Sequence, residues 1–242
     1  MIHLSLKTSS VGFGVVDELK RVICFNPSSI FGQLLWYLWY SFFLPIESTL
    51  HLILPPLNFT NLSALRSGNI SVRAKEKGVD GFYITPSGMK YASLKSKDIV
   101  FVSLKGLFNK KKNKPSSEWR FHQDIYVNKK EAKAIVHAHS TCATAISTHQ
   151  RNIPAFHYMV AVAGGEDIKC SKYATFGTKN LSRNIIKALK NRTACLIANH
   201  GQVAFGENLE KTFELAQEIE NICHQYINAL RIGIPKILSK KE

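Results

Sequence analysis

The sequence predicts an α/β layer fold. Short apolar runs bounded by turn residues, which are typical of strands, occur repeatedly between residues 62 and 102. Helical patterns, with apolar residues three and four positions apart, become frequent after residue 118. The glycine patterns of dinucleotide-binding and P-loop proteins do not occur in these 242 residues, so a nucleotide-binding α/β fold is not expected.

Three strands are expected in the first half of this region. Residues 68–73 lead from a turn into a strand, residues 82–85 form a second strand, and residues 99–102 form a third. The turn residues 86–88, Pro-Ser-Gly, close the second strand. This part of the chain therefore predicts a small sheet.

Helices and strands then alternate. Residues 118–129 carry Phe121, Ile125 and Tyr126 at helical spacing, and Ser116 or Ser117 is the expected N-cap. Further helices are expected at 141–149, 181–189 and 209–230, and further strands at 134–136, 193–198 and 202–205.

The last of these helices has the clearest pattern. Asn208 is its expected N-cap. The apolar positions predicted to share one face are Leu209, Phe213, Ala216, Cys223, Ile227 and Leu230.

Residues 1–60 form an atypical apolar segment before the main domain at residues 61–242. Aromatic residues crowd its second half, but Pro45, Glu47 and His51 interrupt the apolar run. A membrane span needs about 20 uninterrupted apolar residues, so membrane contact of this segment is only the weaker alternative. No basic start with a clean apolar run and a cleavage site precedes it, so a secretory signal is not expected.

The chain has a formal net charge of +15. Its basic residues are mostly scattered lysines, with dense runs only at residues 105–114 and near the end. No RNA-recognition, helix-turn-helix or zinc-finger pattern accompanies them, so nucleic acid is not an expected partner. A phosphate-bearing substrate would fit the positive charge.

The cysteines indicate a reducing compartment, and hence a cytoplasmic protein. They are odd in number, widely spaced and without a C-x-x-C pair, which argues against a disulfide framework and a cysteine-type zinc site. Cys195 and Cys223 fall in apolar patterns and are expected to be small core residues.

Three histidines are the strongest candidates for chemistry. His137 and His139 follow an apolar run at an i, i+2 spacing, which on an extended chain places both imidazoles on the same side. His200 also directly follows an apolar run. With a carboxylate from Glu118, the set becomes three histidines and one acid, which suits zinc. An H-x-H pair alone is more often structural, so the pattern around it carries this interpretation.

The stretch from Gly68 to about Leu230 closely resembles the class II aldolase/adducin family. The shared text includes GNISVR, ITPSG, PSSEWRFH, IVHAHS, YATFGT and ALKNRTACLIANHG, in order. The resemblance implies a three-layer α/β fold in which helices flank a central, mostly antiparallel sheet. It also implies a zinc-dependent aldolase, a cytoplasmic homotetramer with sites at subunit interfaces. Such an enzyme cleaves a ketose 1-phosphate, of the L-fuculose 1-phosphate type, to dihydroxyacetone phosphate and a small aldehyde.

The resemblance also assigns roles to residues. His137, His139 and His200 match the zinc-binding histidines, and Glu118 matches the catalytic, zinc-associated glutamate. Tyr158 matches a catalytic tyrosine that reaches into the neighbouring subunit's site. The positions that match substrate-binding residues are Asn69, Ser87, Gly88, Ser116 and Ser117 for the phosphate, and Phe176 as an aromatic lining the site.

Several alternatives remain at this stage. A pentulose-phosphate epimerase of the same family is disfavoured, because that branch has aspartate where this chain has Glu118. A methylthioribulose-phosphate dehydratase uses the same metal set. Residues 1–60 do not match the helical start of the family, so an inactive, decaying copy with an altered N-terminus is a further alternative. The remaining histidines have no matching ligand role and are expected to be structural or exposed: His122, His149, His157 and His224.

Overall fold

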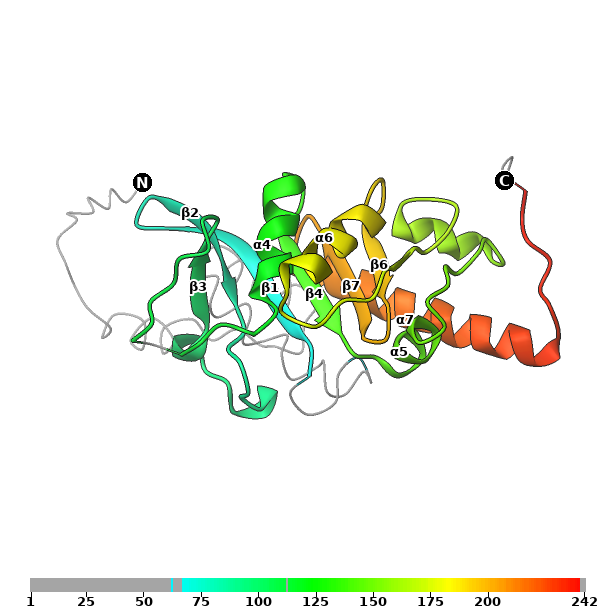
Figure 1. Ribbon diagram of the computed structural model, residues 1–242, viewed down its shortest axis with the longest axis horizontal. Coiled ribbons are helices and arrows are strands. Elements are labelled where there is room, and N and C mark those ends of the chain that lie inside the picture. Colours follow the sequence, from blue (N-terminus) through cyan, green and yellow to red (C-terminus); the bar gives the residue numbers. More distant parts are fainter. Residues whose placement is uncertain (1–61, 63–66, 112, 240–242) are drawn as a thin grey trace, which may run out of the picture. The chain divides into compact units, whose positions relative to one another are not determined.

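A seven-stranded sheet lies between helices in the computed structural model, which describes residues 62, 67–111 and 113–239 (Figure 1). The strands follow the order β3-β2-β1-β4-β7-β6-β5. Their bounds are Asn69–Glu76 for β1, Val79–Ile84 for β2, Val100–Ser103 for β3, Ala134–Ala138 for β4, Cys170–Ser171 for β5, Ala194–Ile197 for β6 and Gly201–Gly206 for β7. The predicted segment at residues 1–60 lies outside the described residues.

The sheet is mostly antiparallel, as predicted. Only β5 runs parallel to its neighbour β6, and the other paired strands are antiparallel. Every strand expected from the sequence is present, with ends shifted by a few residues. Strand β5 was not predicted, because two residues are too few to show a periodic pattern.

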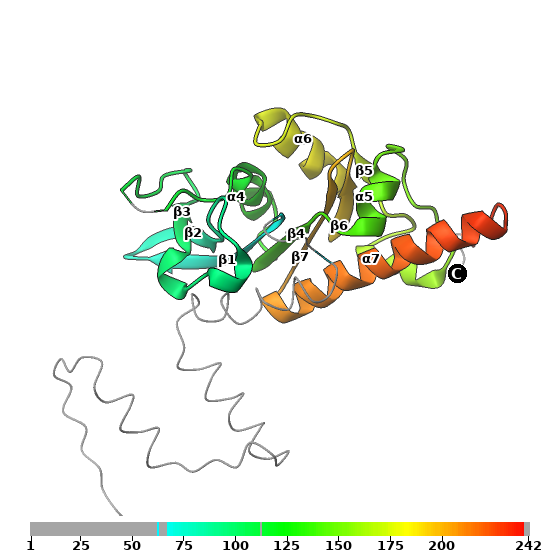
Figure 2. The ribbon, with the colours of Figure 1, turned by 90° about the horizontal axis from the view of Figure 1, so that it is seen from below.

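Helices cover both faces of this sheet (Figure 2). Helices α4 (Trp119–Asn128) and α6 (Lys179–Ala188) pack against each other on one face, and α5 (Thr141–Ser147) packs with α7 (Leu209–Ile232) on the other. Short 3-10 helices complete the described elements: η1 at Tyr91–Ser93, η2 at Ser96–Asp98 and η3 at Tyr158–Ala163. The predicted three-layer α/β fold is therefore confirmed.

The two cores follow from the alternation of side chains along the strands. In β4, Ala134, Val136 and Ala138 face the core shared with α5 and α7. Ile135 faces the opposite core, with α4 and α6, and His137 lies on that side against Phe121. Because both faces are covered, β4 is buried at every position.

Helix α7 differs in part from the predicted face. Asn208 caps it as expected, since its side chain accepts a hydrogen bond from the Lys211 N–H. Leu230 was wrongly assigned to the buried face, because it is 48% exposed near the end of the helix. Thr212, Ile219 and Ile222 are buried instead, alongside the predicted Leu209, Ala216 and Cys223. Phe213 and Ile227 are partly buried against the same core, and Leu230 lies beyond Cys223, the last buried residue of the helix.

The start of helix α4 differs from the predicted capping. The helix begins at Trp119, and Glu118 occupies its N-cap position without a side-chain capping bond. The Ser116 hydroxyl accepts a hydrogen bond from the Glu118 N–H, so this serine holds the residue before the helix rather than capping the helix itself.

Among the described residues, no helix is long and apolar enough to cross a membrane.

Candidate metal centre

Four separate parts of the chain meet at one edge of the sheet. Asn69, the first residue of β1, pairs with His137 near the end of β4. Strand β7 runs antiparallel to β4, so the turn between β6 and β7, which carries His200, lies at the same edge. Glu118 enters from the loop before α4. Antiparallel pairing therefore brings residues distant in sequence to one place.

The predicted ligands form a tight cluster. The ligand atoms of Glu118, His137, His139 and His200 all lie within 4.8 Å of one another. The two carboxylate oxygens of Glu118 contact different histidines: Oε2 lies 3.1 Å from Nε2 of His137, and Oε1 lies 3.2 Å from Nε2 of His200. Nε2 of His139 lies 3.0 Å from Nε2 of His137.

The charges of these groups depend on one another. Burial would raise the pKa of Glu118, but His137, through its charge and a hydrogen bond, and then His200 and His139 hold that pKa well below its usual range. Burial would lower the pKa of His137, but Glu118 raises it above the ordinary value. Burial and the neighbouring histidines lower the pKa of His139 to about 3 and that of His200 to about 4. At neutral pH, His139 and His200 therefore offer free lone pairs.

The cluster fits a divalent metal ion. Within the described residues, Glu118 Oε1 is buried without a hydrogen-bond partner, which is costly unless a cation is bound there. Nδ1 of His137 bonds to the Gln202 carbonyl oxygen, so it carries a proton and Nε2 is directed into the cluster. Imidazole and carboxylate donors of this kind suit zinc, although other divalent ions accept the same set.

A pocket of about 390 Å³ opens beside the cluster. It is lined by His139, His200 and Glu118, while His137 is buried behind them. Every residue predicted to bind substrate lines the same pocket: Asn69, Ser87, Gly88, Ser116, Ser117 and Phe176. Tyr158 is not among the lining residues; it belongs to η3 and is 71% exposed. The pocket thus joins a polar wall to the candidate metal ligands.

Sequence reasoning missed several residues of the site. Tyr173, Ala174 and Asn199 also line the pocket. His122 was expected to be structural or exposed, and it is fully buried, with hydrogen bonds to Ser71 and Asn69. Its position four residues after Glu118, on one helix face, was the available signal. His149 and His224 are exposed and His157 is partly buried, in agreement with their expected roles.

Gly201 holds the turn that carries His200, and a side chain there would not fit. A Cβ atom at this position would lie 2.3 Å from the carbonyl oxygen of Ala138. We expect Gly201→Ala to lower the free energy of unfolding by about 1–3 kcal/mol, the range for overpacked sites, and to weaken zinc binding by moving His200. Thermal unfolding and zinc titration measure the two effects.

Gly78→Ala is the matched control for Gly201→Ala. Gly78 has a positive φ of 81°, but a Cβ there meets no atom within 4 Å, and the turn between β1 and β2 is remote from the histidines. This variant is expected to lose some stability and to keep the zinc affinity of the parent protein. Unchanged zinc affinity in Gly201→Ala would contradict the role given to the turn.

The comparison with known proteins agrees with this geometry. The family model described as "Class II Aldolase and Adducin N-terminal domain" matches residues 57–227. The chain belongs to the class II aldolase and adducin family. A 5-methylthioribulose-1-phosphate/5-deoxyribulose-1-phosphate aldolase of Rhodospirillum rubrum is 47% identical over 176 residues, 73% of this chain and 77% of that protein. The L-fuculose phosphate aldolase of Escherichia coli K12 is 46% identical over 177 residues, 73% and 80% of the two chains.

A solved structure supports the same family membership. The structure of an L-fuculose 1-phosphate aldolase matches with a TM-score of 0.76 and 36% sequence identity. The match covers 81% of the chain described here and 91% of the solved chain. The expected family membership and fold are therefore confirmed. The prediction of a class II aldehyde-lyase, which requires a metal, is confirmed at the level of the family, because these relatives are named as aldolases.

Proposed function

We propose that this protein is a zinc-dependent aldolase that cleaves a ketose 1-phosphate to dihydroxyacetone phosphate and a small aldehyde. One observation carries the proposal: the cluster of Glu118 and three histidines borders a pocket whose remaining wall is rich in hydroxyl, amide and backbone N–H groups. The names of the relatives support it, since both kinds are aldolases acting on ketose 1-phosphates or sugar phosphates.

His137, His139, His200 and Glu118 would hold the zinc ion. When bound, the ion would supply Lewis-acid stabilisation of the negative charge that develops on substrate oxygens during carbon–carbon cleavage. Because neutral histidines leave the ion its full double positive charge, this donor set favours that role. His137 is held by the Gln202 carbonyl and the other two histidines lie at the pocket wall.

Glu118 is the proposed acid–base group. It lines the pocket, and its lowered pKa keeps the carboxylate ionised, the form that can accept a proton, at neutral pH. Asn69 Nδ2 donates a hydrogen bond to its Oε2 at 3.0 Å, the oxygen that also lies 3.1 Å from Nε2 of His137, and so helps to fix the carboxylate. We assign to Glu118 the proton exchange at the substrate carbon that becomes nucleophilic.

Other lining residues form the proposed phosphate site. Backbone N–H groups and short polar side chains can bind phosphate, and Ser87, Gly88 and Ser117 are exposed residues that line the pocket. Asn69 and Ser116 complete the set from a buried position. Phe176, 65% exposed, would cover the rest of the substrate.

Tyr158 supports a proposed homotetramer with sites shared between subunits. A phenol is well suited to exchange a proton with the aldehyde oxygen, yet Tyr158 lies outside its own chain's pocket and is largely exposed. We expect Tyr158→Phe to lower kcat by about 10²–10⁴-fold, the range for one general acid–base group. Mixing it with inactive His137→Ala subunits would restore part of the activity, and a mixture as inactive as its components would contradict the shared site.

The decisive assay uses purified protein loaded with zinc. L-Fuculose 1-phosphate and 5-deoxyribulose 1-phosphate are supplied separately, and released dihydroxyacetone phosphate is measured with metal content. Cleavage of either supports the proposal, and the kcat/KM ratio identifies the preferred aldehyde half. Loss of water from methylthioribulose 1-phosphate, epimerisation of a pentulose phosphate, or an inactive, insoluble protein would each overturn it in favour of the corresponding alternative.

Zinc uptake is expected to release a proton from His137. In the metal-free protein, Glu118 raises the pKa of His137, whereas a bound ligand must be neutral. The apparent zinc affinity should therefore increase with pH until it passes the raised pKa, and then level off. Calorimetry of zinc binding in buffers of different ionisation enthalpy counts the released protons, and a count near zero at pH 6.5, below the raised pKa, would contradict this assignment.

We also propose a cytoplasmic location. The described cysteines, Cys142, Cys170, Cys195 and Cys223, are all free thiols, which is the state favoured in a reducing compartment. Cys195 and Cys223 are fully buried core residues, as the sequence predicts.

A further inference from the structure

We propose that His122 is a positioning residue that orients the amide of Asn69, which in turn leaves the hydrogen of the Ser116 hydroxyl free to donate to an anionic group in the pocket. The inference rests on the proposed function for the nature of the substrate, but its geometry stands on the hydrogen bonds themselves. His122 lies on α4 and is fully buried against Phe121, with its ring stacked on that side chain.

The direction of each hydrogen bond follows from the carboxylate of Glu118. A carboxylate only accepts, so the Asn69 atom that lies 3.0 Å from Glu118 Oε2 is the donor Nδ2. The amide oxygen of Asn69 therefore faces His122, and it too can only accept. Nε2 of His122 must then carry a hydrogen and donate it to Asn69.

The other side of the ring completes the assignment. Burial and the charge of His137 lower the pKa of His122 to about 3, so the ring is neutral and Nδ1 has no hydrogen. Nδ1 accepts from the Ser71 hydroxyl at 2.7 Å. The Ser71 oxygen, 2.8 Å from the Tyr126 hydroxyl, accepts from Tyr126 in turn. One tautomer of His122 is thus fixed from both sides.

The fixed orientation of the Asn69 amide determines how the Ser116 hydroxyl can bond in the pocket. Its oxygen accepts from Asn69 Nδ2 at 2.9 Å and from the Glu118 N–H at 3.3 Å, which uses both of its lone pairs. The hydrogen of the Ser116 hydroxyl remains available for donation, and Ser116 lines the pocket. A hydroxyl that can only donate favours an anion such as a phosphate group over a neutral or donating ligand.

The test compares two replacements of His122 whose side-chain amides occupy the positions of different ring nitrogens. The amide of His122→Gln reaches approximately the position of Nε2 and can still donate to Asn69, whereas that of His122→Asn matches only the Nδ1 position. We expect His122→Asn to weaken binding of inorganic phosphate to the zinc-loaded protein, and to raise KM for the sugar phosphate, by about tenfold, as for loss of one charged-ligand hydrogen bond. His122→Gln should retain most of the phosphate affinity and most of the parent KM. In both variants kcat should change less than KM.

Ser182→Ala is the structural control. Ser182 is a buried residue of α6, and its hydroxyl donates a hydrogen bond to Asp124 on α4, the helix that carries His122. Ser182 does not line the pocket. It should lower the thermal unfolding temperature without changing phosphate binding. Equal loss of phosphate binding in Ser182→Ala and His122→Asn, or no difference between His122→Gln and His122→Asn, would overturn the inference.

Nitrogen NMR of the unsubstituted protein determines the tautomer of His122 directly, so this test does not depend on whether a variant folds. The long-range nitrogen–proton correlations of His122 should show a proton on Nε2 and none on Nδ1. A proton on Nδ1 would overturn the inference. Because phosphate binding and the tautomer are measured without turnover, a protein that shows both but cleaves no ketose 1-phosphate would refute only the proposed function.

Discussion

Replacing His137 by alanine is expected to abolish stoichiometric zinc binding and reduce activity below detection. This histidine is fully buried at the centre of the cluster, within contact distance of Glu118 and His139. Changes to residues that merely support a metal ligand cost roughly 10–100-fold in affinity or activity, and removal of the ligand itself should exceed this range. Metal analysis of the purified variant and the dihydroxyacetone phosphate assay measure the two losses.

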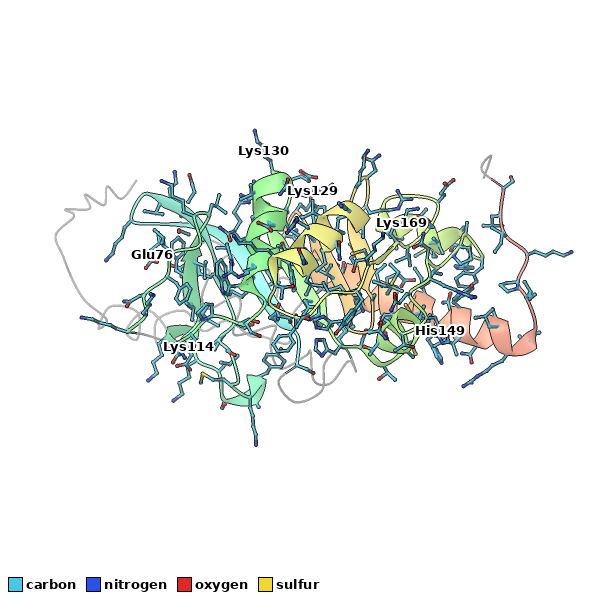
Figure 3. The ribbon with its side chains drawn as sticks, in the orientation of Figure 1. Glu76, Lys114, Lys129, Lys130, His149 and Lys169 are labelled. Carbon is cyan, nitrogen blue, oxygen red and sulfur yellow. The ribbon has the colours of Figure 1, made fainter. Side chains whose placement is uncertain are left out.

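His149→Ala is the control for His137→Ala. His149 is exposed just beyond α5, where Figure 3 labels it, and it makes no contact with the cluster. It should retain one zinc ion per chain and full activity. A His137→Ala protein that remains folded, as judged by thermal unfolding, and still binds one zinc ion tightly would refute the metal centre described above.

Replacing Glu118 by glutamine is expected to lower kcat by about 10²–10⁴-fold, the usual contribution of one acid–base group. The amide has nearly the shape of the carboxylate, and its oxygen can still accept the hydrogen bond from Asn69. It cannot take up the substrate proton. Kinetics at saturating zinc separate this effect from weaker metal binding, because the three histidines remain in place.

Glu76→Gln is the matched control for Glu118→Gln. Glu76, labelled in Figure 3, is the last residue of β1, whereas Asn69 is the first. The Glu76→Gln substitution makes the same change of charge at a residue that does not line the pocket. Its kcat should equal that of the parent protein. If Glu118→Gln at saturating zinc retains kcat within a few-fold, Glu118 does not exchange the proton and only binds the metal.

The proposed phosphate-bearing substrate also accounts for the positive charge without a nucleic acid. Lys130 projects from the end of α4 and Lys114 lies before that helix, at opposite edges of the view in Figure 3. Basic side chains spread in this way raise the overall attraction for a phosphate-bearing substrate without forming a groove for a polymer. The net charge of +15 is therefore compatible with a small anionic substrate.

The sequence by itself determined the strands and helices with strong patterns and the identity of the four candidate ligands. The i, i+2 spacing of His137 and His139 required only an extended chain. The cap at Asn208 and the helix after it were also local features, confirmed by the hydrogen bond to Lys211. Signals within a few residues suffice for such features because the physics that produces them is local.

The tertiary structure decided which distant groups meet. Pairing of Asn69 with His137, and of β4 with β7, brings Glu118 and His200 to the same edge of the sheet. The exposure of Leu230 and the burial of Ile219 depend on where α7 crosses the sheet, which its own periodicity does not reveal.

The role of His122 also emerges only in three dimensions. The spacing of four residues between Glu118 and His122 indicates a shared helix face but no particular role, and the proposed role depends on Asn69 and Ser71 of β1, which lie more than 50 positions earlier. Hydrogen-bond direction is set by the partners that folding supplies, because an imidazole can place its proton on either nitrogen. Sequence thus specifies the available donors and acceptors, and strand pairing decides how they are used.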